Sequence, residues 1–225
     1  MKQRNLLLMF LILLTAISPA KASVMINEVF ADPAADLTGD ANNDGVRSGS
    51  DDEFIEILNA SPAGMDISGW SLADNVSTRH IFPLDTILSP YSFLVIFGGG
   101  SPLWPDIHWQ IASSGALGLN NSGDTVSLFD DQSTLINQVI YGSIGDKNQS
   151  ITRFPDGEGS EFVLHSSLRE AQGALFSPGM SVDSRLSLAL VEEEVPPNNP
   201  VVPELPAIVY YGFGWGALLL KRQYL

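Results

Sequence analysis

The residues best suited to chemistry lie in the stretch Asp40–Asp51, which reads D-x-N-x-D-G-x5-D. Oxygen-bearing side chains stand at positions 1, 3, 5 and 12 of a twelve-residue loop, and Gly45 stands at position 6. Calcium takes about six to eight oxygen ligands, and a loop that turns sharply at a glycine can supply them. The spacing predicts a calcium site made of the side chains of Asp40, Asn42 and Asp44, the backbone carbonyl of Val46, and Asp51.

This loop departs from the EF-hand pattern and resembles the calcium loop of dockerins more closely. Asp51 stands where an EF-hand has a bidentate glutamate. Pro33 and Gly39 leave little room for a helix that would enter the loop. Asp52 and Glu53 come next and are placed to substitute for the closing ligand. The alternative interpretation is a solvated acidic turn built on Asn-Asp-Gly.

Catalytic patterns are weaker than the metal pattern. Glu28 and Glu56 could pair across neighbouring strands as acid and base, as in glycosidases, or could lie on a solvated strand face. The three histidines lie far apart, and the chain has no cysteine and no G-x-S-x-G motif. A Ser-His-Asp triad assembled in space stays open. We therefore expect a protein that is not an enzyme, with a hydrolase as the last-ranked alternative.

The elements that must position these residues are predicted to be β-strands. Short runs rich in β-branched and aromatic residues are punctuated by Gly, Pro, Asn and Asp, and residues 23–190 show no long helical period. This pattern favours an all-β antiparallel sandwich or barrel, with Trp70 in the core and a turn at Gly98–Gly100. The expected strands are 24–30, 53–59, 70–73, 80–82, 93–97, 125–129, 135–141 and 162–164.

Several of these cues occur in the order found in one family. The chain contains INEVF at 26–30, DEFIEILN at 52–59, ISGWSL at 67–72, FLVIFGGG at 93–100 and LNNSGDTVSL at 119–128. This series resembles a secreted bacterial lamin tail domain, and 146–155 and 165–179 resemble its ending. The resemblance implies an immunoglobulin-like β-sandwich, usually a non-catalytic accessory or adhesion-like module. Loops 31–51 and 98–123 would then lie at one end as a contact surface.

The two ends of the chain predict export. Residues 1–22 have a basic start, an apolar run and an A-x-A cleavage site, which is typical of a signal peptide. Residues 207–225 are apolar, end in a basic cluster and follow Pro203-Glu204-Leu205-Pro206. This tail resembles a PEP-CTERM sorting signal, which implies a processing enzyme of the exosortase type. A plain membrane anchor formed by an apolar C-terminal helix is the alternative.

These features divide the chain into four parts. Residues 1–22 are the signal peptide, 23–180 the sandwich with the inserted loop 31–51, 181–206 an acidic Pro-rich linker, and 207–225 the sorting or anchoring tail. The expected location is the cell surface, the outer membrane or the extracellular space.

The composition limits the partners. The formal net charge of −15 disfavours binding to nucleic acid. We expect a structural or adhesive role, with calcium as the bound ion and an extracellular polysaccharide or a surface protein as partner. In the alternative of a polysaccharide-binding module, Trp104, His108 and Trp109 would contact the sugar.

Overall fold

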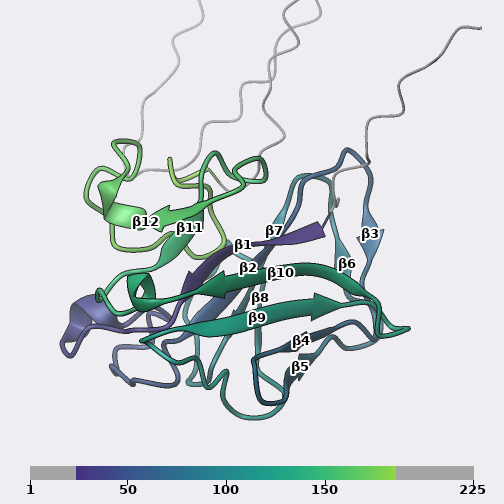
Figure 1. Ribbon diagram of the computed structural model, residues 1–225, viewed down its shortest axis with the longest axis horizontal. Helices are drawn as coiled ribbons and strands as arrows, with labels where there is room; N and C mark the ends of the chain where they lie inside the picture. Colours follow the sequence, from purple (N-terminus) through teal and green to yellow (C-terminus); the bar gives the residue numbers. More distant parts are fainter. Residues whose placement is uncertain (1–23, 186–225) are drawn as a thin grey trace, which may run out of the picture.

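A computed structural model of the chain describes residues 24–185 (Figure 1). In this range the regular structure consists of β-strands and three short 3-10 turns, with no α-helix, and no helix could cross a membrane. The all-β prediction is therefore confirmed for these residues. The predicted signal peptide and C-terminal tail lie outside the described residues.

The larger sheet has six strands in the order β12-β11-β1-β2-β7-β8. Their bounds are Phe162–Leu164, Ile151–Arg153, Val24–Phe30, Phe54–Asn59, Phe93–Phe97 and Trp109–Ile111. All neighbours are antiparallel except β7 and β8, which run parallel. The first described strand, β1, therefore lies inside the sheet, between β2 and β11.

The second sheet has four strands in the order β10-β9-β4-β5 and packs on the first (Figure 1). Their bounds are Leu135–Tyr141, Asp124–Phe129, Ser71–Ala73 and Thr78–Ile81. A small third sheet joins β3 (Met65–Asp66) to β6 (Ile87–Leu88). The 3-10 turns are Leu37–Gly39, Ser143–Gly145 and His165–Ser167.

The six-stranded sheet is buried on both faces. On one face, Ile55 and Ile57 meet the second sheet in the main core, where Trp70 also packs, as predicted. On the other face, Phe54 and its neighbours form a second cluster under Trp104, Ile107, Ile111 and Phe176. Burial on both faces explains why β2 shows only partial alternation of apolar and polar residues.

The packed chain continues past residue 180. Ser181 is fully buried and the side chain of Val182 is 2% exposed. The backbone N–H of Val182 donates to Asp156 Oδ2 at 3.1 Å, which fixes this segment beside the six-stranded sheet. Residues 181 and 182, where the linker was predicted to begin, therefore pack against the sandwich.

Candidate functional site

The acidic loop folds around the carboxylate of Asp40. Asp40 Oδ1 accepts the N–H of Asp44 at 3.2 Å, and Oδ2 accepts the N–H of Gly45 at 2.9 Å. Asn42 Oδ1 also accepts the N–H of Asp44, and Asp44 Oδ1 accepts the N–H of Val46. The chain can turn this tightly because Gly45 has a φ of +85°, a conformation that suits glycine. The side-chain oxygens of positions 1, 3 and 5 are thus gathered in one short turn.

The same loop is docked on the segment that follows β7. Asn42 Nδ2 donates to the carbonyl of Gly99 at 3.3 Å, and the N–H of Ser101 donates to Asp44 Oδ2 at 3.0 Å. The indole of Trp104 donates to the carbonyl of Ala41 at 2.9 Å. Predicted loops 31–51 and 98–123 therefore do meet, over residues 41–44 and 99–104.

Close approach of these loops explains the glycine run. A methyl group on Gly98 would overlap the carbonyl oxygen of Ser50, and one on Gly99 would overlap the carboxylate of Asp51. At Gly100 it would meet the side chains of Asn42 and Asp44. The run Gly98–Gly100 lets the acidic loop lie directly on the backbone, which the sequence prediction of a simple turn did not include.

The carboxylate that turns toward the acidic turn is Asp52, one residue after the predicted closing ligand. Asp52 is fully buried, and its Oδ1 accepts the N–H of Asn42 while Oδ2 accepts the N–H of Ser48 at 2.7 Å. Burial raises the pKa of Asp52, and the nearby charges of Asp40 and Asp44 raise it further. Asp51 instead lies against Gly99. The structure thus favours Asp52 as the carboxylate that closes the loop.

Glu53, the other substitute considered for the closing ligand, points elsewhere. Its Oε2 accepts the N–H of Leu119 at 3.3 Å, so it ties β2 to the segment before β9. Burial raises its pKa to about 7. Within residues 24–185, no group of three or more His, Asp or Glu side chains is already arranged to hold a metal ion. A metal at this loop would therefore need amide and backbone carbonyl oxygens as well as carboxylates.

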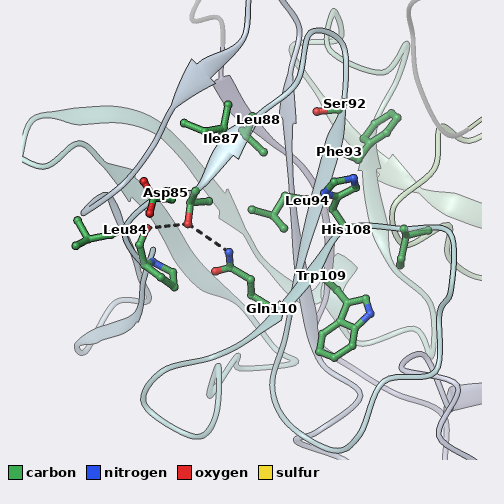
Figure 2. A pocket seen from close by; sticks show the side chains of 13 residues that line it. Leu84, Asp85, Ile87, Leu88, Ser92, Phe93, Leu94, His108, Trp109 and Gln110 are labelled. Atoms are coloured by element: carbon green, nitrogen blue, oxygen red, sulfur yellow. Dashed lines mark hydrogen bonds between the residues drawn. The ribbon is translucent and has the colours of Figure 1, made fainter.

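The predicted sugar-contact residues are only partly brought together. His108 and Trp109 line a groove of about 480 Å³ between β6 with its preceding turn and β7 with β8 (Figure 2). Trp104 lies apart from it, packed on the second core cluster with its indole N–H bound to Ala41. Gln110 and Leu84, which also line the groove, were missed because nothing local in the sequence distinguishes them.

Glu28 and Glu56 do face each other, as the acid–base interpretation required. They are direct partners in the β1–β2 register, and both are fully buried. The interpretation of a solvated strand face was wrong, because residues 165–182 cover this face of the sheet. Glu56 Oε1 accepts Asn27 Nδ2 at 2.9 Å, and Oε2 accepts the N–H of Gly179 at 2.7 Å. The two carboxylates hold residues 165–182, called the C-terminal segment below, in place.

Glu28 belongs to a buried row of hydrogen bonds with Ser177 and His165. Ser177 Oγ lies 2.9 Å from Glu28 Oε2 and 2.9 Å from His165 Nε2, while His165 Nδ1 lies 2.9 Å from the carbonyl of Ala174. A carbonyl only accepts, so Nδ1 carries a hydrogen. The hydroxyl of Ser177 has one hydrogen for its two contacts, so the hydrogen of the other contact must come from His165 Nε2 or from Glu28. The row is therefore complete only when it holds one proton more than a neutral histidine and an ionised glutamate carry.

This row contains Ser, His and Glu but is not a nucleophilic triad. In a triad the acid orients the histidine, whereas here Glu28 contacts the serine and a backbone carbonyl orients His165. Ser177 is 4% exposed, and His165 and Glu28 are fully buried. A substrate has no access to the hydroxyl, so these residues stabilise the fold.

The comparison with protein families decides the relationship of the chain. The model of the lamin tail domain matches residues 17–143. The chain belongs to the lamin tail domain family. Lamin tail domains are immunoglobulin-like and generally non-catalytic, which agrees with the all-β sandwich and the buried carboxylates. A search of curated proteins found no match to the chain.

The matched part of this lamin tail domain ends before the sheet is complete. Strands β11 and β12 and the segment that binds Glu28 and Glu56 all follow residue 143. The likeness seen in 146–155 and 165–179 lies outside the match, yet these residues pack as part of the same sandwich.

The raised pKa of Glu28 predicts that the free energy of unfolding falls as the pH rises. Burial raises the pKa of Glu28 above 4.5, although His165, Ser150 and Ser177 oppose the change. The folded state therefore binds more protons, and this stabilisation is complete below about pH 4.5 and lost as pH rises through the raised pKa. For each proton that the folded state binds in excess, the free energy of unfolding falls by about 1.4 kcal/mol for every pH unit of increase in that interval. Urea unfolding of wild type between pH 4.5 and 7 measures the slope.

Glu28→Gln is the matched control for this slope. The amide oxygen can accept from Ser150 and the Ser177 N–H, and the amide nitrogen can donate to Ser177 Oγ, as a protonated glutamate would. We expect a less negative slope in the variant, because the amide takes up no proton and because removing the charge of Glu28 also removes one cause of the raised pKa of Glu56. Burial lowers the pKa of His80, which gives an opposite trend below pH 6.5 in both proteins and cancels in the difference. Equal slopes would show that Glu28 takes up no proton on folding.

Proposed function

We propose that this lamin tail domain is an exported, non-catalytic module that binds calcium through residues 40–52 and has a structural or adhesive role. The observation that carries the proposal is the folded acidic turn, in which Asp40, Asn42 and Asp44 lie together against the glycine run. A cell-surface, outer-membrane or extracellular location is supported by the signal-like N-terminus and the sorting-like C-terminus of the sequence.

The residues present fit calcium better than a transition metal. Their donors are carboxylate, amide and carbonyl oxygens, which calcium prefers, and the turn contains neither His nor Cys. Asp40, Asn42, Asp44, the Val46 carbonyl and Asp51 or Asp52 would hold the ion. The charges of Asp40 and Asp44 lie close enough to raise the pKa of Asp52, and a divalent cation would relieve this repulsion. The ion would thereby tighten the contact between the two loops.

Calcium is expected to stabilise the protein in a saturable way. For a dissociation constant of about 0.1–1 mM, about 10 mM calcium should add roughly 1.5–3 kcal/mol to the free energy of unfolding. In a domain of this size the melting temperature would rise by several degrees. A thermal melt with calcium titrated upward from chelator measures the effect in wild type, Asp40→Ala and Asp44→Ala.

The control for this titration removes a charge elsewhere. Asp131 is exposed on the turn between β9 and β10, so Asp131→Asn should keep the full calcium response. Asp40→Ala and Asp44→Ala should lose it. An equal response in all four proteins, or none in wild type, would leave residues 40–52 as a solvated turn and refute the calcium proposal.

The groove between β6 and β8 favours polysaccharide binding as a second candidate function. His108 and Trp109 line this groove, whereas Trp104 supports the acidic loop. A surface protein is the other expected partner, and the acidic chain disfavours nucleic acid. The sorting-like tail would engage a processing enzyme or a membrane. A hydrolase ranks last, since its best Ser-His pair is buried.

A further inference from the structure

The groove between β6 and β8 contains a side-chain amide whose orientation is fixed from behind. The N–H of Ser113 donates to His80 Nδ1 at 3.2 Å, so His80 must carry its hydrogen on Nε2. His80 is 2% exposed, and its Nε2 lies 2.8 Å from Gln110 Oε1. The imidazole therefore donates to the amide oxygen. The amide nitrogen of Gln110 must then point the other way, toward the groove.

The far wall of the groove limits what this amide contacts. Thr86 Oγ1 donates to the carbonyl of Pro83 at 2.8 Å and lies 3.5 Å from Gln110 Nε2. One N–H of the amide is thus directed at Thr86 over a long distance, and the other has no partner among the described residues. Figure 2 shows Gln110 pointing toward the turn that carries Leu84 and Asp85, with the indole of Trp109 directed away. A ligand in the groove would meet a pre-oriented donor.

The turn opposite Gln110 is also fixed before any ligand arrives. The N–H of Ile67 donates to the carbonyl of Thr86 at 3.0 Å, and the N–H of Thr86 donates to Ser68 Oγ at 3.3 Å. Asp85 holds a φ of +64°, which is a strained conformation for a residue other than glycine. A preformed wall lowers the entropic cost of binding.

The lining suits a neutral, hydroxyl-rich ligand. The lining combines apolar side chains at Leu84 (84% exposed) and Ile87 (56% exposed) with polar ones at Asp85 and His108. Within residues 24–185, no Lys or Arg lines the groove. An anionic ligand would therefore be repelled by Asp85 and by the net negative charge of the chain. Sugars offer apolar ring faces together with hydroxyls that donate and accept. A groove of about 480 Å³ lies in the range of small-ligand sites.

We propose that the groove between β6 and β8 binds sugar residues of a neutral glycan, with Gln110 donating to a sugar hydroxyl or ring oxygen. This ligand class deepens the adhesive role proposed above and rests on it. An extended protein segment would have to pair with β8 as an added strand. Such pairing is disfavoured, because β8 has only three residues and His80 already contacts the backbone of Ile111.

Affinity electrophoresis of the full chain tests this assignment. Gels would contain hydroxyethyl cellulose, dextran or galactomannan as neutral probes, alginate as an acidic probe, and gelatin as a protein probe. We expect retardation by at least one neutral polysaccharide and none by alginate or gelatin. Gln110→Glu keeps the contact with His80 but replaces the donor by a carboxylate, and should weaken binding by about tenfold or more.

Two further variants at exposed side chains test the groove without risk of misfolding, and a third variant serves as the control. Leu84→Ala and His108→Ala change solvent-facing side chains and should also weaken binding, whereas Leu37→Ala alters a leucine of similar exposure far from the groove and should not. The proposal would be overturned if all variants were retarded equally, if no neutral polysaccharide retarded the wild type, or if gelatin alone did. Asp40→Ala separates the two sites, since it should lose the calcium response and retain glycan binding.

Discussion

Phe54→Ala is expected to lower the free energy of unfolding by about 3–5 kcal/mol. Phe54 is fully buried, and its ring centroid lies 5.6 Å from that of Phe30, 5.9 Å from Phe97 and 6.3 Å from Phe176. The contacts join β1, β2, β7 and the C-terminal segment, so the cavity would lie where four parts of the chain meet. Urea unfolding followed by tryptophan fluorescence measures the loss.

Two variants give the scale for this result. Phe54→Leu retains most of the buried volume and should cost less than Phe54→Ala. Ile140→Ala removes a side chain that is 74% exposed and should change stability by no more than about 0.5 kcal/mol. If Phe54→Ala cost no more than Ile140→Ala, the second core cluster would contribute nothing to stability.

Glu28→Ala is expected to cost about 3 kcal/mol near pH 5, where the buried row with His165 and Ser177 holds its extra proton. The change leaves the backbone N–H of Ser177 without its acceptor in a region closed to water, and the hydroxyl of Ser150 keeps only the carbonyl of Leu175 at 3.2 Å. Loss of these contacts also loosens the segment that covers Glu56. Chemical denaturation at fixed pH, together with proteolysis of the C-terminal segment, measures both effects.

The same position offers an almost isosteric comparison. Glu28→Gln can satisfy every partner and should stay within about 1 kcal/mol of wild type near pH 5. A large gap between the alanine and glutamine variants would assign the cost to hydrogen bonding. Equal, large losses in both would mean that the row requires a negative charge at Glu28 and not only its hydrogen bonds.

The long strands could be predicted from sequence because their signal is local. Runs 24–30, 93–97 and 135–141 became β1, β7 and β10 with the predicted bounds. The missed strands β3, β6, β8 and β11 have two or three residues, too few to show a period, although β12, also of three residues, was predicted from its apolar run. Pairing with distant neighbours determines these strands, as β11 shows by lying against β1.

The candidate sites divide in the same way. The spacing from Asp40 to Asp44 is readable because those residues gather within one turn. The burial of Glu28 and Glu56 depends on residues 165–182, and the orientation of Gln110 depends on His80, thirty positions away in the chain. One local signal was available in FIEILN, where apolar residues on both sides of Glu56 indicate a strand buried on both faces.

The interior position of β1 has a consequence for the order of synthesis. The neighbour on one side of β1 begins at residue 54, but the other, β11, begins at residue 151. At roughly 5–20 residues per second, the ribosome delivers that second partner several seconds later. Until then β1 presents an unpaired apolar edge, which is a site for aggregation. The six-stranded sheet can therefore be completed only after the residues of β12 have emerged.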